Sequence, residues 1–219
     1  MDKEEMKSFS CSDCGAANCF HQDSKFPSFC LTTHTRQELI DECLNLYKGD
    51  DLVAKLAKTA AEIEGTYYGK LTRAEEIIAF AKRIGAKKIG IATCVGLLNE
   101  AKIFSKILKA KGLECYCVIC KVGSVDKTEI GIPNELKLQK DCFEGICNPV
   151  LQAKLLNEAK TDLNVINGLC VGHDSLFIKY SEAIVTTLIT KDRVTGHNPA
   201  AALYTSNFYY KRLLEENNI

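Results

Sequence analysis

The chain has no tryptophan, only two methionines among 219 residues, and no net charge. Lysine plus arginine and aspartate plus glutamate each total 28, so no excess positive charge attracts nucleic acid or an anionic membrane. The longest apolar runs, such as 184–189, fall far short of the roughly 20 residues that a membrane-spanning helix needs. The acidic start lacks the basic residues and apolar stretch of a secretory signal. These absences predict a cytoplasmic protein with neither a nucleic-acid nor a membrane partner.

Cysteine is the residue in excess. The chain has 12 cysteines, whereas its 46% hydrophobic and 26% charged residues are ordinary for a globular protein. A chain of this length can bury an adequate core without disulfides, which are rare in a reducing cytosol. Clustered cysteines are therefore expected to be metal ligands or reactive thiols.

The hydrophobic pattern predicts two parts, a Cys-rich metal-binding module over 1–34 and an α/β domain over 35–219. In the second part, short buried strands alternate with amphipathic helices, which indicates right-handed crossovers and a parallel sheet. We expect a small doubly wound, Rossmann-like sheet of about four strands covered by helices. The strands are predicted over 88–93, 113–122, 163–168 and 183–190, and the helices over 36–47, 52–64, 72–84, 97–108, 150–160, 175–180 and 199–216. About 25 residues before Cys147 have no clear elements, and loops of that length are usually functional, so this segment is predicted to be a lid or ligand-bearing arm.

The first group of candidate ligands lies in the N-terminal module. Cys11, Cys14, Cys19 and Cys30 have the spacing C-x2-C-x4-C-x10-C. Four thiolates suit a structural zinc ion and a 4Fe-4S cluster equally well by number, so the spacing does not choose the metal. His21 or His34 could replace one thiol.

The second group converges only through the predicted fold. The carboxyl ends of parallel strands meet at one edge of the sheet, where doubly wound proteins bind their ligands. The motif C-V-G follows two strands, at Cys94 and Cys170, and Cys147 precedes a helix that starts with Asn-Pro. Helix N-termini favour thiolates, so these three are predicted metal ligands, with Cys120 or Cys142 as a fourth. Alternatively, the C-V-G turns need only a small residue before glycine, which would make the thiols packing residues.

Polar residues follow the last two strands at the same edge. His173 and Asp174 are candidate catalytic residues, and Lys191, Arg193 and His197 are candidates for holding an anionic substrate or cofactor. The alternative is that Asp174 or Asn198 caps a helix and the charges form a solvated rim. The turns lack the GxGxxG and Walker patterns, so a nucleotide site is poorly supported. The isolated thiols of Cys43, Cys115 and Cys117 are predicted to pack as small hydrophobic residues.

The chain resembles an uncharacterised family of bacterial and archaeal proteins, the domain of unknown function 1847, which is described as metal-binding. The resemblance covers nearly the whole chain and rests on the N-terminal cysteines and on TCVGL, CNP, GLCVGHDSLF and KDRVTGHNPAAALY. The family pattern expects proline after the last N-terminal cysteine, where this chain has Leu31. The resemblance supports metal binding and implies no reaction.

The leading hypothesis is a cytoplasmic iron–sulfur protein with an N-terminal four-cysteine centre and a second thiolate site at the sheet edge, acting on a redox partner or a small-molecule ligand. The alternative is a protein with a structural zinc knuckle that senses or binds a soft metal or small ligand without turnover. A third hypothesis is thiol catalysis by Cys94 or Cys170 without metal. The sequence does not indicate a substrate or an oligomeric state.

Overall fold

The computed structural model describes residues 9–216 and divides into two compact units, one ending at Ala61 and one beginning at Glu62. The division falls inside helix α4 (Leu52–Tyr67). It does not test the boundary predicted at residue 34, which stays a prediction. Residues 1–8 of the predicted N-terminal module lie outside the described residues.

The first unit contains short helices α1 (Asn18–His21) and α2 (Leu31–His34), followed by the longer α3 (Gln37–Lys48). The buried side chain of Asn18 closes the loop after α1, since it donates to the Ser24 carbonyl oxygen and accepts from the Ser24 amide. Helix α3 follows the three- and four-residue spacing of its apolar residues, as predicted.

The second unit is built on a parallel sheet with the strand order β2-β1-β3-β4. The strands are β1 (Lys88–Thr93), β2 (Glu114–Ile119), β3 (Leu163–Asn167) and β4 (Ile184–Ile189). The chain leaves β1 for β2 on one side and later returns to β3 on the other. The structure therefore confirms the predicted doubly wound α/β fold, whose strand order reverses between β1 and β3.

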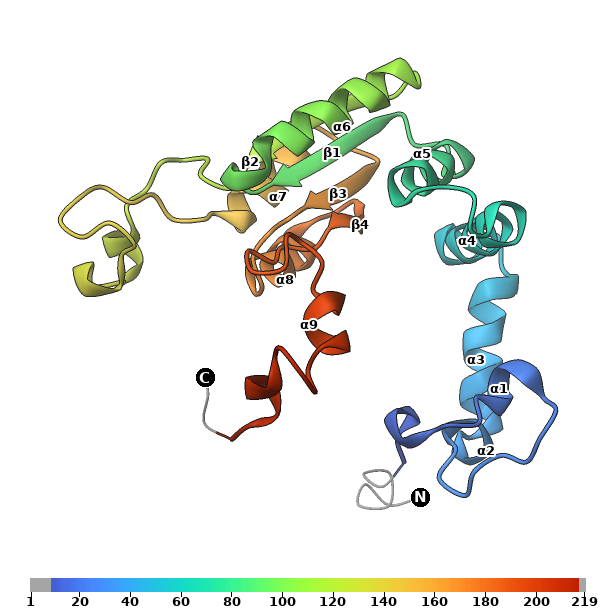
Figure 1. Ribbon diagram of the computed structural model, residues 1–219. Helices are drawn as coiled ribbons and strands as arrows, with labels where there is room; N and C mark the ends of the chain where they lie inside the picture. Colours follow the sequence, from blue (N-terminus) through green and yellow to red (C-terminus); the bar gives the residue numbers. More distant parts are fainter. Residues whose placement is uncertain (1–8, 217–219) are drawn as a thin grey trace. The chain divides into compact units, whose positions relative to one another are not determined.

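Helices cover both faces of this sheet (Figure 1). Helices α5 (Arg73–Ile84) and α6 (Leu98–Ala110) pack on one face, against the buried side chains of Ile89, Ile91 and Val165. Helices α7 (Pro149–Glu158) and α8 (His173–Tyr180) pack on the other, against Ala92 and Ile166. Adjacent strand residues thus face opposite layers, which explains why the strands appear as continuous apolar runs in the sequence.

Local signals account for several helix ends. Thr72 and Glu75 form the predicted capping box of α5, and Gly85 ends that helix in the left-handed conformation. Two predicted helix ends were wrong.

The helix predicted over 52–64 does not end before Gly65. Helix α4 continues through it, because one glycine costs a helix only about 1 kcal/mol.

The predicted helix over 199–216 is also much shorter. Helix α9 (Ala200–Tyr204) is followed by turns and by the 3-10 segment Lys211–Leu214. The sequence Thr205-Ser206-Asn207 interrupts it, because short polar side chains compete with the backbone amides for carbonyl acceptors. The Thr205 hydroxyl, for example, donates to the Ala201 carbonyl oxygen.

Buried amides hold the carboxyl ends of the strands together. Gln152 of α7 is fully buried and donates to the carbonyl oxygens of Thr93 and Val118, at 3.2 and 2.7 Å. Asn167, at the end of β3, donates to the Thr93 hydroxyl and to the Leu97 carbonyl oxygen. These bonds fix the backbone from which the candidate site projects.

In the part of the chain described, no helix combines the length and apolar character that crossing a bilayer requires.

Candidate functional site

Three thiols lie side by side where the strands end. The Cys120 amide donates to the Thr93 carbonyl oxygen at 2.8 Å, which extends the β1–β2 ladder by one pair and sets Cys120 beside Cys94. The Asn148 amide donates to the Cys120 carbonyl oxygen at 2.7 Å, which brings Cys147 to the other side of Cys120. We call Cys94, Cys120 and Cys147 the thiol row. Cys94 and Cys120 are buried, whereas Cys147 is half-buried.

Hydrogen bonding makes one end of the row a thiolate. The pKa of Cys94 is lowered to about 5, chiefly by hydrogen bonding to the Cys120 thiol, with contributions from the Gly96 amide and the Lys191 ammonium, against the opposing effect of burial. Lys191 can approach because Gly96 has no side chain, and a Cβ there would lie 3.3 Å from its Nζ. Lys191 was predicted to hold an anionic ligand, and the anion it contacts is the Cys94 thiolate.

The other end of the row has the same character. The Cys120 thiol also lowers the pKa of Cys147 to about 5, assisted by the Lys121 ammonium and by His173. The pKa of Cys120 itself is strongly raised by its hydrogen bonds to Cys147 and Cys94 and by burial, so it keeps its proton. Cys120 also accepts a hydrogen bond from the Val95 amide at 3.3 Å. The row is therefore a protonated thiol between two thiolates.

Cys170 lies near this row on the turn after β3. Arg193 donates to the Cys170 sulfur at 3.0 Å, and this hydrogen bond, with the charges of Cys170, Cys94 and Cys147, raises the pKa of the guanidinium. The Cys170 carbonyl oxygen accepts the first amides of α8. The structure therefore places Cys94, Cys120, Cys147 and Cys170 near the carboxyl edge of the sheet, and their role as metal ligands stays a prediction.

The other predicted site residues lie outside the thiol row. His173 begins α8 and acts on Cys147 through its charge, whereas the Asp174 carboxylate accepts the Ser175 amide at 2.8 Å near the helix start. His197 closes its own loop, since its Nδ1 accepts the Asp192 amide at 3.2 Å. Cys142 is exposed within the segment before Cys147, and within residues 9–216 no hydrogen bond joins its thiol to the row.

Lys121 is a site residue that the sequence analysis missed. It directly follows Cys120, and its ammonium contacts both Cys147 and the Gly145 carbonyl oxygen. A cation immediately after a strand-terminal cysteine was the available signal.

The N-terminal thiols lie on or beside short helices of the first unit: Cys11 begins a 3-10 turn that Cys14 ends, Cys19 lies in α1, and Cys30 precedes α2. Cys11 and Cys19 are exposed, and Cys14 and Cys30 are half-buried. The two histidines near them have aromatic neighbours, because His34 stacks on Phe9 at 4.2 Å and His21 meets Phe20 edge-on.

The three predicted packing thiols differ. Cys115 packs against the core between the sheet and α6, and its thiol faces the Ser105 carbonyl oxygen at 3.8 Å. Cys43 and Cys117 are exposed, contrary to the prediction. Cys117 belongs to β2, an edge strand of the sheet.

Residues 121–147 form an ordered arm that leaves the carboxyl edge of the sheet (Figure 1). Asp126 organises it: a hydrogen bond from Lys137, at 2.8 Å, and the Thr128 and Glu144 amides hold the pKa of this carboxyl below its usual range. An antiparallel bridge between Asp126 and Gly145 ties the two ends of the arm. The predicted irregular segment thus has a defined conformation.

Replacing Asp126 with alanine is expected to loosen this arm while leaving the sheet intact. The substitution removes several charge-assisted hydrogen bonds, so trypsin cleavage at Lys137 and Lys140 should become roughly tenfold faster or more. Mass spectrometry of timed digests measures this rate. The exposed Glu135 of the same arm provides the control, as E135A. Equal cleavage of the wild type and D126A would contradict the role assigned to Asp126.

A metal site can be tested against these side chains. Within residues 9–216, no three or more His, Cys, Asp and Glu side chains form a group that could hold a metal ion as placed. Thiolates are donors that select zinc, copper(I) and iron–sulfur clusters. Sharing one ion would require the thiols to rotate about their Cα–Cβ bonds.

Comparison with known proteins relates most of the chain to a family. The model of a family described as "Protein of unknown function (DUF1847)" matches residues 30–188. The chain is 48% identical over 206 residues to an uncharacterised protein, MJ0455, of Methanocaldococcus jannaschii, a match that covers 94% of this chain and 98% of that protein. No solved structure matches the chain. The family match includes the thiol row and Cys170 and begins at Cys30, so the chain belongs to the DUF1847 family of proteins of unknown function.

Proposed function

We propose that this protein binds a soft metal centre at the carboxyl edge of its sheet, through the thiolates of Cys94 and Cys147 and through Cys120, which releases its proton when the metal binds, with Cys170 as the candidate fourth ligand. The observation that carries the proposal is the thiol row itself. Three separate segments deliver three thiols to one hydrogen-bonded row, and two of the thiols have pKa values of about 5. Metal binding needs deprotonated thiols, so sites that lower thiol pKa values favour it.

The cations beside the row support the same proposal. Lys191 contacts Cys94, Lys121 contacts Cys147 and Arg193 contacts Cys170. A divalent ion or an iron–sulfur cluster with three or four thiolates retains a net negative charge, which neighbouring cations stabilise. The half-buried position of Cys147 and Cys170 leaves the centre open on one side to a small ligand or a redox partner.

The identity of the metal is proposed separately. An iron–sulfur centre is the first candidate, and zinc is the alternative, because the same donors suit both. The N-terminal Cys11, Cys14, Cys19 and Cys30 are proposed as a second, separable centre, supported by their spacing in the sequence. One centre at the sheet edge and two centres on the chain would give different numbers of metal centres per protein molecule.

The test is metal and acid-labile sulfide analysis of full-length protein purified without oxygen, with its absorption spectrum. In C120S and C147S, the affinity of the edge centre should fall roughly tenfold or more, as measured by competition with a chelator. C117S, which changes an exposed thiol on β2, should keep the wild-type affinity. C14S should affect only the N-terminal centre.

Two results would overturn the proposal. One is the absence of stoichiometric metal from the anaerobic wild type, and the other is an unchanged metal content in a folded C120S variant. Should metal-free, folded protein instead have one rapidly alkylated thiol of low pKa, the row would act by thiol chemistry without a metal.

A further inference from the structure

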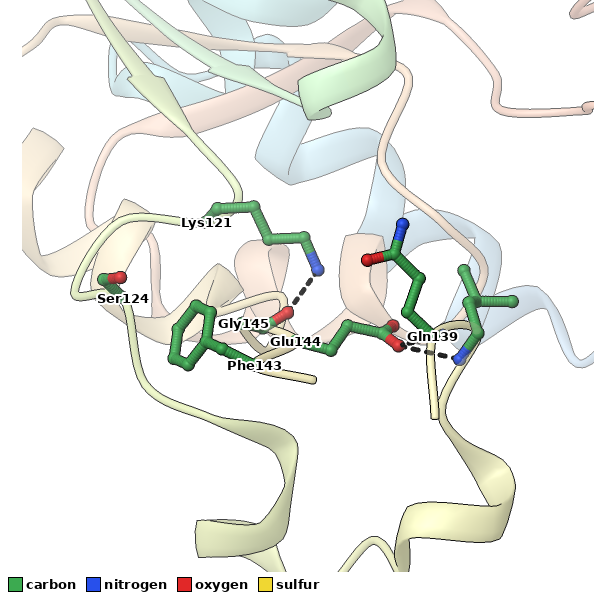
Figure 2. Close-up of a pocket in the computed structure, with 7 residues that line it drawn as sticks. Lys121, Ser124, Gln139, Phe143, Glu144 and Gly145 are labelled. Atoms are coloured by element: carbon green, nitrogen blue, oxygen red, sulfur yellow. Dashed lines mark hydrogen bonds between the residues drawn. The ribbon is translucent and has the colours of Figure 1, made fainter. Parts of the chain in front are cut away.

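The arm contains a cavity that the proposed metal centre does not use. It has a volume of about 340 Å³ and is lined by Lys121, Ser124, Leu138, Gln139, Phe143, Glu144 and Gly145 (Figure 2). Small-molecule sites typically measure roughly 300–1,000 Å³, so this cavity suits a ligand with few heavy atoms.

The walls of the cavity are held in place without a ligand. Glu144 accepts the amides of Leu138 and Gln139, at 2.7 and 3.3 Å, and pairs with Lys127. The Lys127 contact lowers the pKa of Glu144, and these bonds engage its carboxylate. Although Glu144 lies in the wall, its charge is therefore balanced locally.

Lys121 supplies a hydrogen-bond donor at the inner end of the cavity. Its ammonium has three N–H groups; it donates to the Gly145 carbonyl oxygen and lies close enough to Cys147 to lower the pKa of that thiol. Figure 2 shows the Lys121 side chain extending across the cavity toward Gly145, with Ser124 and Gln139 at the periphery. The Lys121 ammonium, the Ser124 hydroxyl and the side-chain amide of Gln139 can each donate a hydrogen bond to an anionic oxygen.

The cavity also has two apolar lining side chains, Phe143 and Leu138. Phe143 is 61% exposed and Leu138 is 90% exposed, although both line the cavity. Apolar side chains left in water beside a cationic donor match a ligand with an apolar body and one anionic end. An aromatic body would also stack on the Phe143 ring.

We propose that this cavity binds a small organic carboxylate, whose carboxylate accepts hydrogen bonds from Lys121 and whose apolar part covers Phe143 and Leu138. Because Lys121 also contacts Cys147, the bound carboxylate lies next to the thiol row. The proposal concerns the arm and holds whether or not the row binds metal.

Benzoate is the probe, and benzamide is its neutral control. Calorimetry and amide chemical shifts of the full-length protein should show saturable benzoate binding, with shifts concentrated at 121–124 and 138–145. K121M should weaken benzoate binding roughly tenfold or more, because it removes a charge-assisted hydrogen bond. K140M, a lysine of the same arm outside the cavity lining, should bind as the wild type does. F143S should weaken benzoate more than it weakens acetate.

The measurements are made on anaerobic protein before and after chelator treatment, so that loss of metal and loss of ligand binding are recorded separately. Equal affinity for benzoate and benzamide, an unchanged affinity in K121M, or shifts outside the arm would each overturn the proposal.

Discussion

Replacing Cys120 with alanine is expected to abolish the low pKa of two other thiols at once. In metal-free wild-type protein, Cys94 and Cys147 have pKa values of about 5, chiefly because each lies beside the Cys120 thiol, whose one S–H can donate to either sulfur. Without that donor, burial raises both pKa values, opposed only by the Gly96 amide and Lys191 at Cys94 and by Lys121 and His173 at Cys147. At neutral pH, the two thiols should change from almost fully ionised to largely protonated. The ultraviolet absorbance of the thiolates, followed as a function of pH, measures the change.

The same substitution should change how stability depends on pH. The folded-state pKa values of about 5 lie below the ordinary thiol value of 9.0, so the unfolded chain binds more protons between these limits. The contribution of the two thiolates to stability is complete above about pH 9 and is lost as the pH falls to about 5. C120A should lack most of this rise when urea unfolding of the metal-free protein is compared at the two ends of the range.

The matched control is C117A, which removes an exposed thiol from β2, the strand that ends just before Cys120. It should retain both low pKa values and the full rise of stability with pH. Two thiols that still titrate near pH 5 in folded C120A would show that the cations alone set their pKa values.

A second large effect is expected from one methyl group in the centre of the sheet. Gly90 lies in β1, where a Cβ would stand 2.0 Å from Oδ1 of Asn164 and 2.9 Å from a Leu156 methyl carbon. Asn164 cannot move freely, because it is fully buried and bonds both Thr161 and Ser181 at 2.7 Å. G90A should therefore lower the free energy of unfolding by about 3 kcal/mol through overpacking and broken buried hydrogen bonds.

Gly65 provides the control for this substitution. It lies in helix α4, and a Cβ there would meet no atom within 4 Å. G65A should stabilise the protein by about 0.5–1 kcal/mol, because alanine is the better helix former. Urea denaturation of the three proteins measures both effects. Equal stability of G90A and the wild type would mean that Asn164 has room that the structure does not give it.

The regular elements of the second unit were predictable because each has a local signal. The β1 bounds agree with the apolar run at 88–93, and the Thr72 capping box marks the start of α5. Elements without such a signal were predicted less well. The C-terminal segment has apolar residues at suitable spacing, yet it is helical only over Ala200–Tyr204. Side chains such as Phe208 remain exposed there, so burial does not offset its weak helix formers.

The approach of the four edge thiols was predictable from the fold, whereas Lys121 and the cause of the low thiol pKa values were not. Parallel strands align their carboxyl ends, so residues 94, 120, 147 and 170 had to approach one another once the fold was recognised. Helix N-termini were the predicted cause of low thiol pKa values. The structure assigns the largest effect to Cys120, a neighbour across the ladder that no sequence spacing reveals.

By itself, the sequence determined the doubly wound sheet, the edge at which its thiols meet and the presence of a long arm, because hydrophobic period and strand direction are local properties of a chain. Tertiary structure alone decided which thiol keeps its proton and which lysine faces it. It also decided that Lys121 connects the thiol row with a cavity in the arm. Protonation and ligand fit depend on contacts of a few ångströms between segments distant in the chain, and these exist only after folding.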